Sequence, residues 1–329
     1  MRRIVVVTQR VDPDHPALAA TVPMLSALAA RVDELAVLAL GAVPGVLPAN
    51  CQVETFGGRS RVERLLRYEA LLAAELRRRP ERLIAHMAPV YAVLAAPLAR
   101  PLGVRTVLWF THWKATPMLR LAERLVDRVA SVDRLSFPLP SAKVLAIGHG
   151  IDLEQFACTE RGDGLRLLAL GRTSPAKGLE TVIRAVEQVD GASLTIRGPS
   201  LTEEERRHRA ELERLADGLP VAIGAAVPRS EVPRLLAEAD LFVNNMRPGA
   251  ADKVVYEAAA GCVPVLASNP SFAELVEPFP RDDPDELARR LRSFAGLSAA
   301  ERTRIGRELR AKVAARHSVD SWADGILGA

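Results

Sequence analysis

The chain has 329 residues, of which 49% are hydrophobic and 26% charged, and its formal net charge is +4. This length suits two domains better than one, and the composition is that of a globular protein. The positive charge does not indicate nucleic-acid binding. It comes mostly from arginines that alternate with acidic residues, as in Arg302 to Arg316, and aromatic residues make up only 4% of the chain.

Apolar runs that alternate with helical patterns predict twelve β-strands. In chain order they are Ile4–Thr8, Leu35–Leu40, Cys51–Phe56, Leu83–Met87, Arg105–Phe110, Val129–Val132, Val144–Ile147, Arg166–Leu170, Ser193–Ile196, Pro220–Ile223, Leu241–Asn244 and Pro264–Ala267. The helical stretches between them include Val62–Arg78, Leu179–Val189, Glu203–Ala216 and Glu301–Ala315. Because such alternation is typical of parallel sheets with helices on both faces, we expect an α/β protein of two doubly wound Rossmann-like domains. The polar stretch Thr159–Gly164 is the expected break between them.

The three cysteines, Cys51, Cys158 and Cys262, are isolated in the sequence, and no pair has the spacing of metal ligands. We interpret them as small buried side chains in a reducing compartment. The longest apolar stretch, Ala85 to Ala99, contains two prolines and is shorter than the ~18 residues that a membrane helix needs. The apolar run after the basic start ends at Val7, which is too short for a signal peptide. These features predict a cytoplasmic protein.

A charged turn follows the strand that ends at Leu170. The segment Gly171–Gly178 carries Arg172 and Lys177 and opens a helix. Such a turn presents free backbone N–H groups and the positive end of a helix dipole, so two added cations predict a diphosphate site. The alternative is a pair of surface charges beside a helix start, which would be slightly unfavourable without an anion.

A single carboxylate, Glu257, lies on a predicted helix of small residues that begins near Lys253. A buried carboxylate needs hydrogen-bonding partners. Two hydroxyls of a ribose would supply them, and so would a neighbouring backbone N–H. An anion site together with this carboxylate suits the two polar parts of a nucleotide sugar.

These two segments together resemble the donor site of retaining glycosyltransferases of family 4, which have the two-domain GT-B fold. The resemblance covers nearly all of the carboxyl-terminal half, and it is weaker in the first half, through Thr111–Trp113 and Ile147–Asp152. It implies an acceptor domain (1–150) and a donor domain (151–317) that face each other across a cleft. Residues 318–329, with a helix over Ser318–Leu327, are expected to return to the first domain.

The resemblance also assigns roles to residues. Arg172 and Lys177 would hold the diphosphate and stabilise the charge that develops as it leaves, and Glu257 would accept the ribose hydroxyls. His112 follows a strand and would lie against the donor sugar; the alternative is a histidine packed between Trp109 and Trp113. Backbone near Gly198 and near Val227, in the loops 198–199 and 225–228, resembles the part of the family that binds the nucleobase.

The sequence departs from the family pattern at Gly249, where the family usually has a second glutamate. Backbone N–H groups of Gly249, Ala250 and Ala251, at the start of the following helix, could still meet sugar hydroxyls or phosphate. Asp252 and Lys253 either take over part of the missing role, pair with each other, or cap the helix.

Asp12, Asp14 and His15 form a polar loop after the first strand, where an acceptor would bind; the two aspartates could equally cap the next helix. His149, between two glycines, is interpreted as a hinge or packing residue.

No metal or other cofactor is expected, because the family uses cationic side chains in place of a metal. The pair Asp282-Asp283 is interpreted as a helix start. The arginine-rich helix 62–79 could lie on an acidic membrane surface, but packing of an amphipathic helix on its own sheet is the commoner explanation.

We therefore expect a glycosyltransferase that moves a sugar from a UDP- or GDP-type donor to a hydroxyl-bearing acceptor, with retention at the anomeric carbon. One alternative is an epimerase or hydrolase of nucleotide sugars with the same fold. The other is a non-catalytic protein that binds a nucleotide sugar, which the missing glutamate keeps open.

Overall fold

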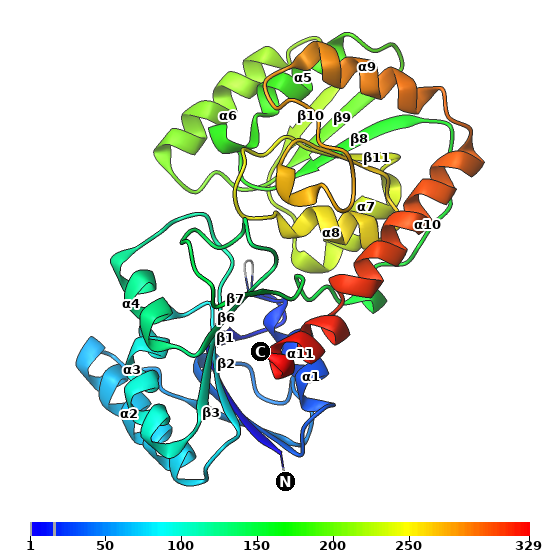
Figure 1. Ribbon diagram of the computed structural model, residues 1–329. Coiled ribbons are helices and arrows are strands. Elements are labelled where there is room, and N and C mark those ends of the chain that lie inside the picture. Colours follow the sequence, from blue (N-terminus) through cyan, green and yellow to red (C-terminus); the bar gives the residue numbers. More distant parts are fainter. Residues whose placement is uncertain (1, 16–17) are drawn as a thin grey trace. The chain divides into compact units, whose positions relative to one another are not determined.

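The computed structural model describes residues 2–15 and 18–329 (Figure 1). The chain forms two compact units. The first comprises Met1–Asp152 together with Arg316–Ala329, and the second comprises Leu153–Ala315. The unit boundaries thus lie two residues from the domain limits expected at 150 and 317. The polar stretch Thr159–Gly164, expected to be the break between domains, lies inside the second unit.

The first unit contains a parallel sheet of seven strands in the order β3-β2-β1-β4-β5-β6-β7 (Figure 1). The strands are β1 (Arg3–Val11), β2 (Glu34–Ala42), β3 (Cys51–Thr55), β4 (Arg82–His86), β5 (Arg105–Trp109), β6 (Arg128–Ser131) and β7 (Val144–Ala146). The helices are α1 (Thr21–Ala29), α2 (Arg61–Arg77), α3 (Pro89–Ala99), α4 (Pro117–Leu125) and α11 (Val319–Gly328), with a short 3-10 helix η1 (Arg100–Leu102).

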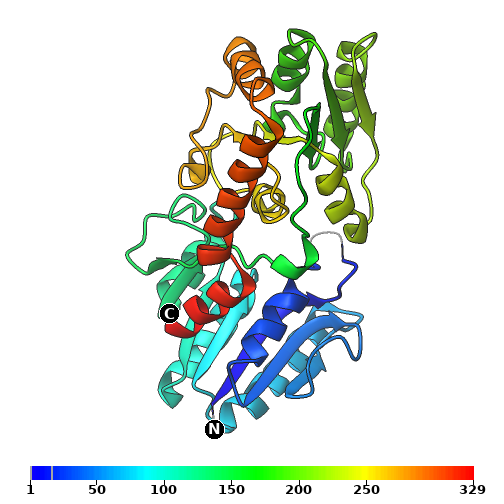
Figure 2. The same cartoon turned by 90° about the vertical axis from the view of Figure 1, so that its right-hand side faces the viewer.

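The centre of this sheet is apolar on both faces, which requires helices on both sides. Val5 and Val7 of β1 pack with Tyr68 and Leu72 of α2 in one core cluster. The helices α1 and α11 lie beside each other over the other side of the sheet (Figures 1 and 2). Trp322 of α11 is 1% exposed. The carboxyl-terminal helix is therefore part of the first unit's core.

The second unit contains a parallel sheet of five strands in the order β10-β9-β8-β11-β12. The strands are β8 (Leu165–Leu170), β9 (Ala192–Arg197), β10 (Val221–Gly224), β11 (Leu241–Asn244) and β12 (Val265–Ala267). The helices are α5 (Leu179–Glu187), α6 (Glu203–Leu215), α7 (Val232–Glu238), α8 (Lys253–Ala260), α9 (Pro284–Ala295) and α10 (Ala299–Arg316). Short 3-10 helices are η2 (Leu153–Gln155), η3 (Pro175–Lys177), η4 (Arg229–Glu231) and η5 (Pro270–Phe272).

The strand order of the second sheet reverses at β8, which lies between β9 and β11. In open parallel sheets, ligands bind outside the carboxyl ends of the strands at such a switch point. The core beneath comes from apolar residues of β8 and β9 packed against α5 and α9, including Leu167, Val182 and Leu287. All twelve predicted strands are found, and the α/β fold class is confirmed.

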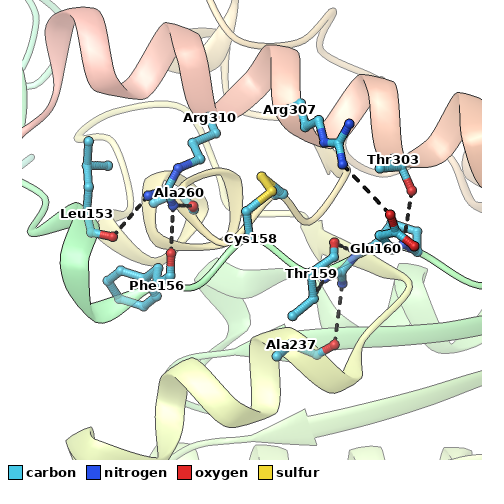
Figure 3. The surroundings of a disulfide bond; sticks show 12 residues. Leu153, Phe156, Cys158, Thr159, Glu160, Ala237, Ala260, Thr303, Arg307 and Arg310 are labelled. Carbon is cyan, nitrogen blue, oxygen red and sulfur yellow. Dashed lines mark hydrogen bonds and ion pairs between the residues drawn. A yellow bond between two sulfur atoms is a disulfide. The ribbon is translucent and has the colours of Figure 1, made fainter.

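A disulfide joins Cys158 to Cys262, whose Cα atoms are 4.9 Å apart, so the expectation of three unpaired cysteines is wrong for these two. The segment that begins the second unit passes the end of α8, and this brings together residues 104 positions apart (Figure 3). Arg310 of α10 ties the same two segments by donating to the backbone oxygens of Phe156, at 2.6 Å, and Ala260. The interpretation of a reducing compartment loses its support. Cys51 is free and half-buried, and burial raises its pKa to about 11.

Candidate functional site

The predicted anion loop, Gly171–Gly178, connects the end of β8 to α5 through η3. Gly178 has a φ of +52°, and a Cβ there would lie 2.6 Å from Asn245 Nδ2, so only glycine fits. Thr173 is fully buried, and its N–H donates to the oxygen of Pro199 at 3.2 Å. The sequence therefore forms a tight loop held against the β9–α6 connection, at the carboxyl end of the central strand.

Both cations of this loop have carboxylate partners. Arg172, whose side chain is 54% exposed, lies 3.3 Å from Glu205 of α6. Lys177, 14% exposed, forms an ion pair with Asp252. These internal carboxylates offset the unfavourable placement of cations before a helix start. The carboxylates of the protein thus already balance the positive charge of the loop. A bound phosphate would have to share the two cations with these carboxylates or displace the carboxylates.

Two asparagines at the end of β11 complete this region, and sequence reasoning missed them. The Nδ2 atom of Asn244 donates to Asp252 Oδ2 at 2.9 Å, and that of Asn245 donates to the oxygen of Gly178 at 2.8 Å. Within residues 2–15 and 18–329, the Oδ1 atoms of both are buried without a hydrogen-bond partner. A polar pair directly after a buried apolar strand was the signal that could have identified them.

The connection after β11 continues through Gly249–Asp252 into α8. Gly249 has a φ of +137°, and its oxygen accepts from Ser271 Oγ at 2.7 Å. Ala250 and Ala251 are buried, and α8 starts only at Lys253, so their N–H groups lie before the helix rather than in it. Asp252 occupies the N-cap position of α8, but its side chain makes no cap hydrogen bond.

Glu257 of α8 is the most buried charge of the region, and its partners are side chains, not a backbone N–H. Arg229 of η4 donates two hydrogen bonds to its carboxylate, at 2.7 Å and 2.5 Å. Lys253, one turn earlier, lies 3.1 Å from Oε1. Of the alternatives for Asp252 and Lys253, the structure therefore shows Asp252 paired with Lys177 and Lys253 paired with Glu257.

The charges around Glu257 decide its protonation. Burial alone would raise the pKa of this carboxyl group, but Lys253 and Arg229 outweigh burial and lower the pKa from 4.5 to about 2. Glu257 is therefore ionised at neutral pH and able to accept hydrogen bonds. Arg229 was not predicted, because nothing in the sequence near it marks a long-range partner.

Gly198 and Val227 lie at the same edge of the sheet, after β9 and β10. A Cβ on Gly198 would collide with the backbone oxygen of Gly171, so glycine allows the two connections to touch. Val227 is half-buried in the connection between β10 and η4. The second unit thus brings all the predicted donor-side residues to the carboxyl ends of β8, β9, β10 and β11.

His112 lies in the first unit, in the connection that follows β5. It is exposed, its ring stacks on Trp113 with centroids 5.4 Å apart, and its Nδ1 accepts from the N–H of Lys114 at 3.0 Å. Trp109 is 2% exposed and packs edge-on against Trp322. The exposure of His112 contradicts the alternative of a packed histidine.

The loop after β1 places Asp12, Asp14 and His15 together. The N–H of Asp14 donates to Asp12 Oδ1 at 3.0 Å, and the N–H of Leu18 donates to His15 Nδ1 at 3.0 Å. The N-cap residue of α1 is Ala20, so neither aspartate caps the next helix. The loop is held by its own side chains.

His149 lies between Gly148 and Gly150, whose φ angles are +80° and +76°. His149 and His317 both belong to the first unit, and burial together with His149 lowers the pKa of His317 to about 3. His149 is half-buried, which fits the packing role expected for it, and its role as a hinge stays a prediction.

The helix α2 combines a packed face with an exposed apolar end. Leu72 and Leu76 are buried in the core, as expected for an amphipathic helix packed on its own sheet, whereas Val62 and Leu66 are 66% and 64% exposed. In the part of the chain that the structure describes, no helix is both long and apolar enough to cross a membrane.

The same described residues contain no cluster of three or more His, Cys, Asp or Glu side chains that could hold a metal ion. The Asp282-Asp283 pair is a helix start, as predicted, because Asp283 Oδ1 accepts from the N–H of Glu286 at 2.9 Å to cap α9.

Comparison with known proteins gives matches at two levels. Residues 164–295 match the family described as Glycosyl transferases group 1. Sucrose-phosphate synthase from Thermosynechococcus elongatus aligns with a TM-score of 0.78 and 16% identity, over 100% of this chain and 98% of the other. The protein has the GT-B glycosyltransferase fold.

Further solved structures share this fold. Anabaena HepE in complex with UDP and glucose aligns with a TM-score of 0.76 and 16% identity, over 100% of this chain and 99% of the other. A glycosyltransferase from Rickettsia africae aligns with a TM-score of 0.72 and 12% identity, over 99% and 97%. A search of curated protein sequences finds no match. The family match covers the sheet and loops of the second unit, including Arg172, Lys177, Arg229 and Glu257, and it supports sugar transfer as the class of activity.

Proposed function

We propose that this protein transfers a sugar from a nucleoside-diphosphate sugar to a hydroxyl-bearing acceptor, with retention at the anomeric carbon. The observation that carries the proposal is the pair Arg172 and Lys177 in the loop after β8, at the switch point of a sheet that matches the glycosyltransferase family. In this proposal the diphosphate binds these two cations. They stabilise the negative charge that grows as the phosphate leaves.

The ion pair between Arg172 and Glu205 is suited to exchange when a ligand binds. Arg172 is more than half exposed, and exposed ion pairs contribute only about 0–1 kcal/mol. A diphosphate carries more charge than the Glu205 carboxylate and accepts several hydrogen bonds at once. We therefore infer that Arg172 turns to the donor when it binds, and that Lys177 bridges the donor and Asp252.

We assign the ribose, base and sugar of the donor to residues by the places of these residues in the second unit. Glu257 meets the ribose, and backbone near Gly198 and Val227 meets the base. Because Gly249 stands where the family has a glutamate, we infer that the sugar is held by the N–H groups of Gly249, Ala250 and Ala251, with Asp252 as the nearby carboxylate.

We assign the acceptor side to the first unit. His112 would contact the donor sugar, and Asp12, Asp14 and His15 would bind the acceptor. Because no base is identified for the acceptor, the leaving phosphate would help to deprotonate the acceptor hydroxyl on the same face of the sugar. Side-chain cations replace a metal in this scheme, so chelation with EDTA should leave the rate unchanged.

The direct test is product analysis with UDP- and GDP-sugars and a panel of hydroxyl acceptors. The proposal predicts a new glycoside with the anomeric configuration of the donor, measured by NMR. Free sugar or an epimer would favour the alternative of a hydrolase or epimerase, and binding without turnover would favour a nucleotide-sugar-binding protein. The UDP series comes first, because the similar HepE structure holds UDP.

A further inference from the structure

Glu257 is already hydrogen-bonded on most of its acceptor sites. Arg229 Nη1 donates to Oε2 at 2.7 Å, and Arg229 Nη2 donates to Oε1 at 2.5 Å. Lys253 Nζ forms an ion pair with Oε1 at 3.1 Å, which is within hydrogen-bonding distance. An ionised carboxylate offers about four lone-pair sites. Among the contacts of residues 2–15 and 18–329, three of these sites are therefore in use, and the site left is on Oε2.

Arg229 and Lys253 lie closer to solvent than the Glu257 carboxylate that they pair with. The Glu257 side chain is 2% exposed, while those of Arg229 and Lys253 are 22% and 27% exposed. A ligand that approaches from solvent consequently meets Arg229 and Lys253 before it meets Glu257. The paired fork of a guanidinium on a carboxylate is among the stronger side-chain interactions in proteins.

Arg229 is held in this position from a second side. Its guanidinium carbon lies 5.7 Å from the centroid of the Phe156 ring, a distance at which a cation is attracted to an aromatic face. Phe156 is 2% exposed. Its segment is fixed by Arg310 and by the disulfide at Cys158 (Figure 3). Moving Arg229 away from Glu257 would cost both the ion pair and this stacking contact.

We propose that Arg229 is a specificity-determining residue that limits Glu257 to a single nucleotide hydroxyl, an inference that rests on the proposed function. A free carboxylate can accept from both hydroxyls of a ribose, but Glu257 has one site left for a donor. A 2′-deoxyribose still offers its 3′ hydroxyl to that site. This protein consequently binds 2′-deoxyribonucleoside diphosphates nearly as well as ribonucleoside diphosphates.

Calorimetric titration of the full chain tests the inference. The probes are UDP, GDP, ADP and CDP, each with its 2′-deoxy counterpart, and the readout is the ratio of the two dissociation constants. We expect a ratio within about 3-fold for the parent. In Arg229→Ala, the freed oxygens of Glu257 can accept both hydroxyls. We expect the ribonucleotide to be favoured by at least ~10-fold there, or ~1.4 kcal/mol.

Two further variants make the result specific. Lys253→Met frees a site on Oε1 of Glu257 and leaves Arg229 in place. The preference for the ribonucleotide should therefore rise in this variant, which keeps the test open if Arg229→Ala does not fold. Arg234→Ala removes a 64% exposed arginine that pairs with Glu238 on α7, and its ratio should equal that of the parent. A merely structural role of Arg229 would change both affinities together and leave the ratio unchanged.

A parent that favours the ribonucleotide by ~10-fold or more, the effect expected of a free carboxylate, overturns the inference. An unchanged ratio in both Arg229→Ala and Lys253→Met overturns it as well. Absence of binding by all eight nucleotides would instead overturn the proposed function, and the inference with it. If Lys177→Ala weakens the binding of all eight nucleotides without changing the ratio of the dissociation constants, the donor site is supported. This result would hold even where the inference about Arg229 fails.

Discussion

The anion loop, Gly171–Gly178, and the carboxylate helix α8 follow neighbouring strands of one sheet but differ in how their charges are held. In the loop, the Arg172 side chain is 54% exposed and its Nη1 atom lies 3.3 Å from Glu205 Oε1. In α8, the Glu257 side chain is 2% exposed and accepts two hydrogen bonds from one guanidinium. Exposed ion pairs contribute about 0–1 kcal/mol, whereas breaking a buried one costs about 3–5 kcal/mol.

This difference in exposure predicts which charges matter most for the stability of the fold and which matter most for ligand binding. Charges that face solvent can change partners when a ligand arrives, so the loop is suited to bind an anion. Charges that are buried and paired also fix the position of a helix. We therefore expect changes around α8 to lower the free energy of unfolding, and changes in the anion loop to lower ligand affinity.

The largest effect is expected from the disulfide next to α8. Cys158→Ser opens a cross-link between residues 104 positions apart. It should lower the free energy of unfolding by roughly 4 kcal/mol, because the unfolded chain gains conformational freedom. Urea unfolding followed by circular dichroism measures the change, and Cys51→Ser, at the free cysteine, is the control. Equal midpoints for the two variants would show that the cross-link adds nothing to the anchoring of α8.

The second effect concerns the charge of Glu257. Its folded-state pKa of about 2 lies below the ordinary 4.5. The ionised form therefore stabilises the fold by about 3 kcal/mol above pH 4.5. This stabilisation is lost as the pH falls through the folded-state pKa, because the unfolded chain takes up the proton first.

Glu257→Gln removes this charge while keeping the side chain's shape. The variant should be less stable than the parent by about 3 kcal/mol at pH 7, and the difference should shrink as the pH falls from 4.5 towards 2. Urea unfolding of both proteins at pH 7 and pH 3 measures it. A difference that does not depend on pH would mean that the ion pair with Arg229 and Lys253 does not stabilise the fold.

The anion loop should behave in the opposite way. Lys177→Ala and Arg172→Ala should each weaken nucleoside diphosphate binding by about 1.5–3 kcal/mol, the value of a hydrogen bond to a charged group. The free energy of unfolding should change by less than about 1 kcal/mol in Arg172→Ala, because exposed pairs contribute little. It should fall further in Lys177→Ala, because the Lys177–Asp252 pair is mostly buried. Arg206→Ala, which removes an exposed arginine of α6, is the matched control for titration calorimetry. Unchanged affinity in both loop variants would exclude this loop as the diphosphate site.

The smallest effect that we predict is on turnover. His112 should act on the sugar as positive charge builds on its ring, an interaction made mainly in the transition state. His112→Ala should bind the nucleoside diphosphate like the parent and turn over the donor at least ~10-fold more slowly, or ~1.4 kcal/mol. Nucleotide release from a UDP- or GDP-sugar measures the rate. A folded variant with the parental rate would remove His112 from the mechanism.

The sequence predicts those parts of this molecule that depend on local pattern. Strand alternation, the charged turn at Arg172 and Lys177, and the helix start at Asp283 are all visible within a few residues of sequence. The pairs Lys177–Asp252 and Arg229–Glu257 are not, because they join connections after different strands and depend on how the sheet brings those connections together.

Contacts between distant segments also explain two other differences between the structure and the expectations from the sequence. Cys158 and Cys262 are 104 residues apart, and only the path of the chain past α8 brings them together. The segment Thr159–Gly164 is polar enough to look like a linker, yet the Arg161 side chain in it is 4% exposed and donates to the oxygen of Ala239 at 2.6 Å. Polar composition alone does not distinguish a linker from a segment whose hydrogen bonds are satisfied by the protein.

We expect a nucleoside diphosphate to bind the second unit at the anion loop and next to α8. Hydrogen exchange of backbone amides, measured by mass spectrometry with and without saturating UDP or GDP, shows where the nucleotide binds. Exchange should become slower in peptides that cover 171–178 and 249–260, because ligand contacts lower the population of open states there. Slower exchange confined to the first unit, with no change in these two segments, would contradict this expectation.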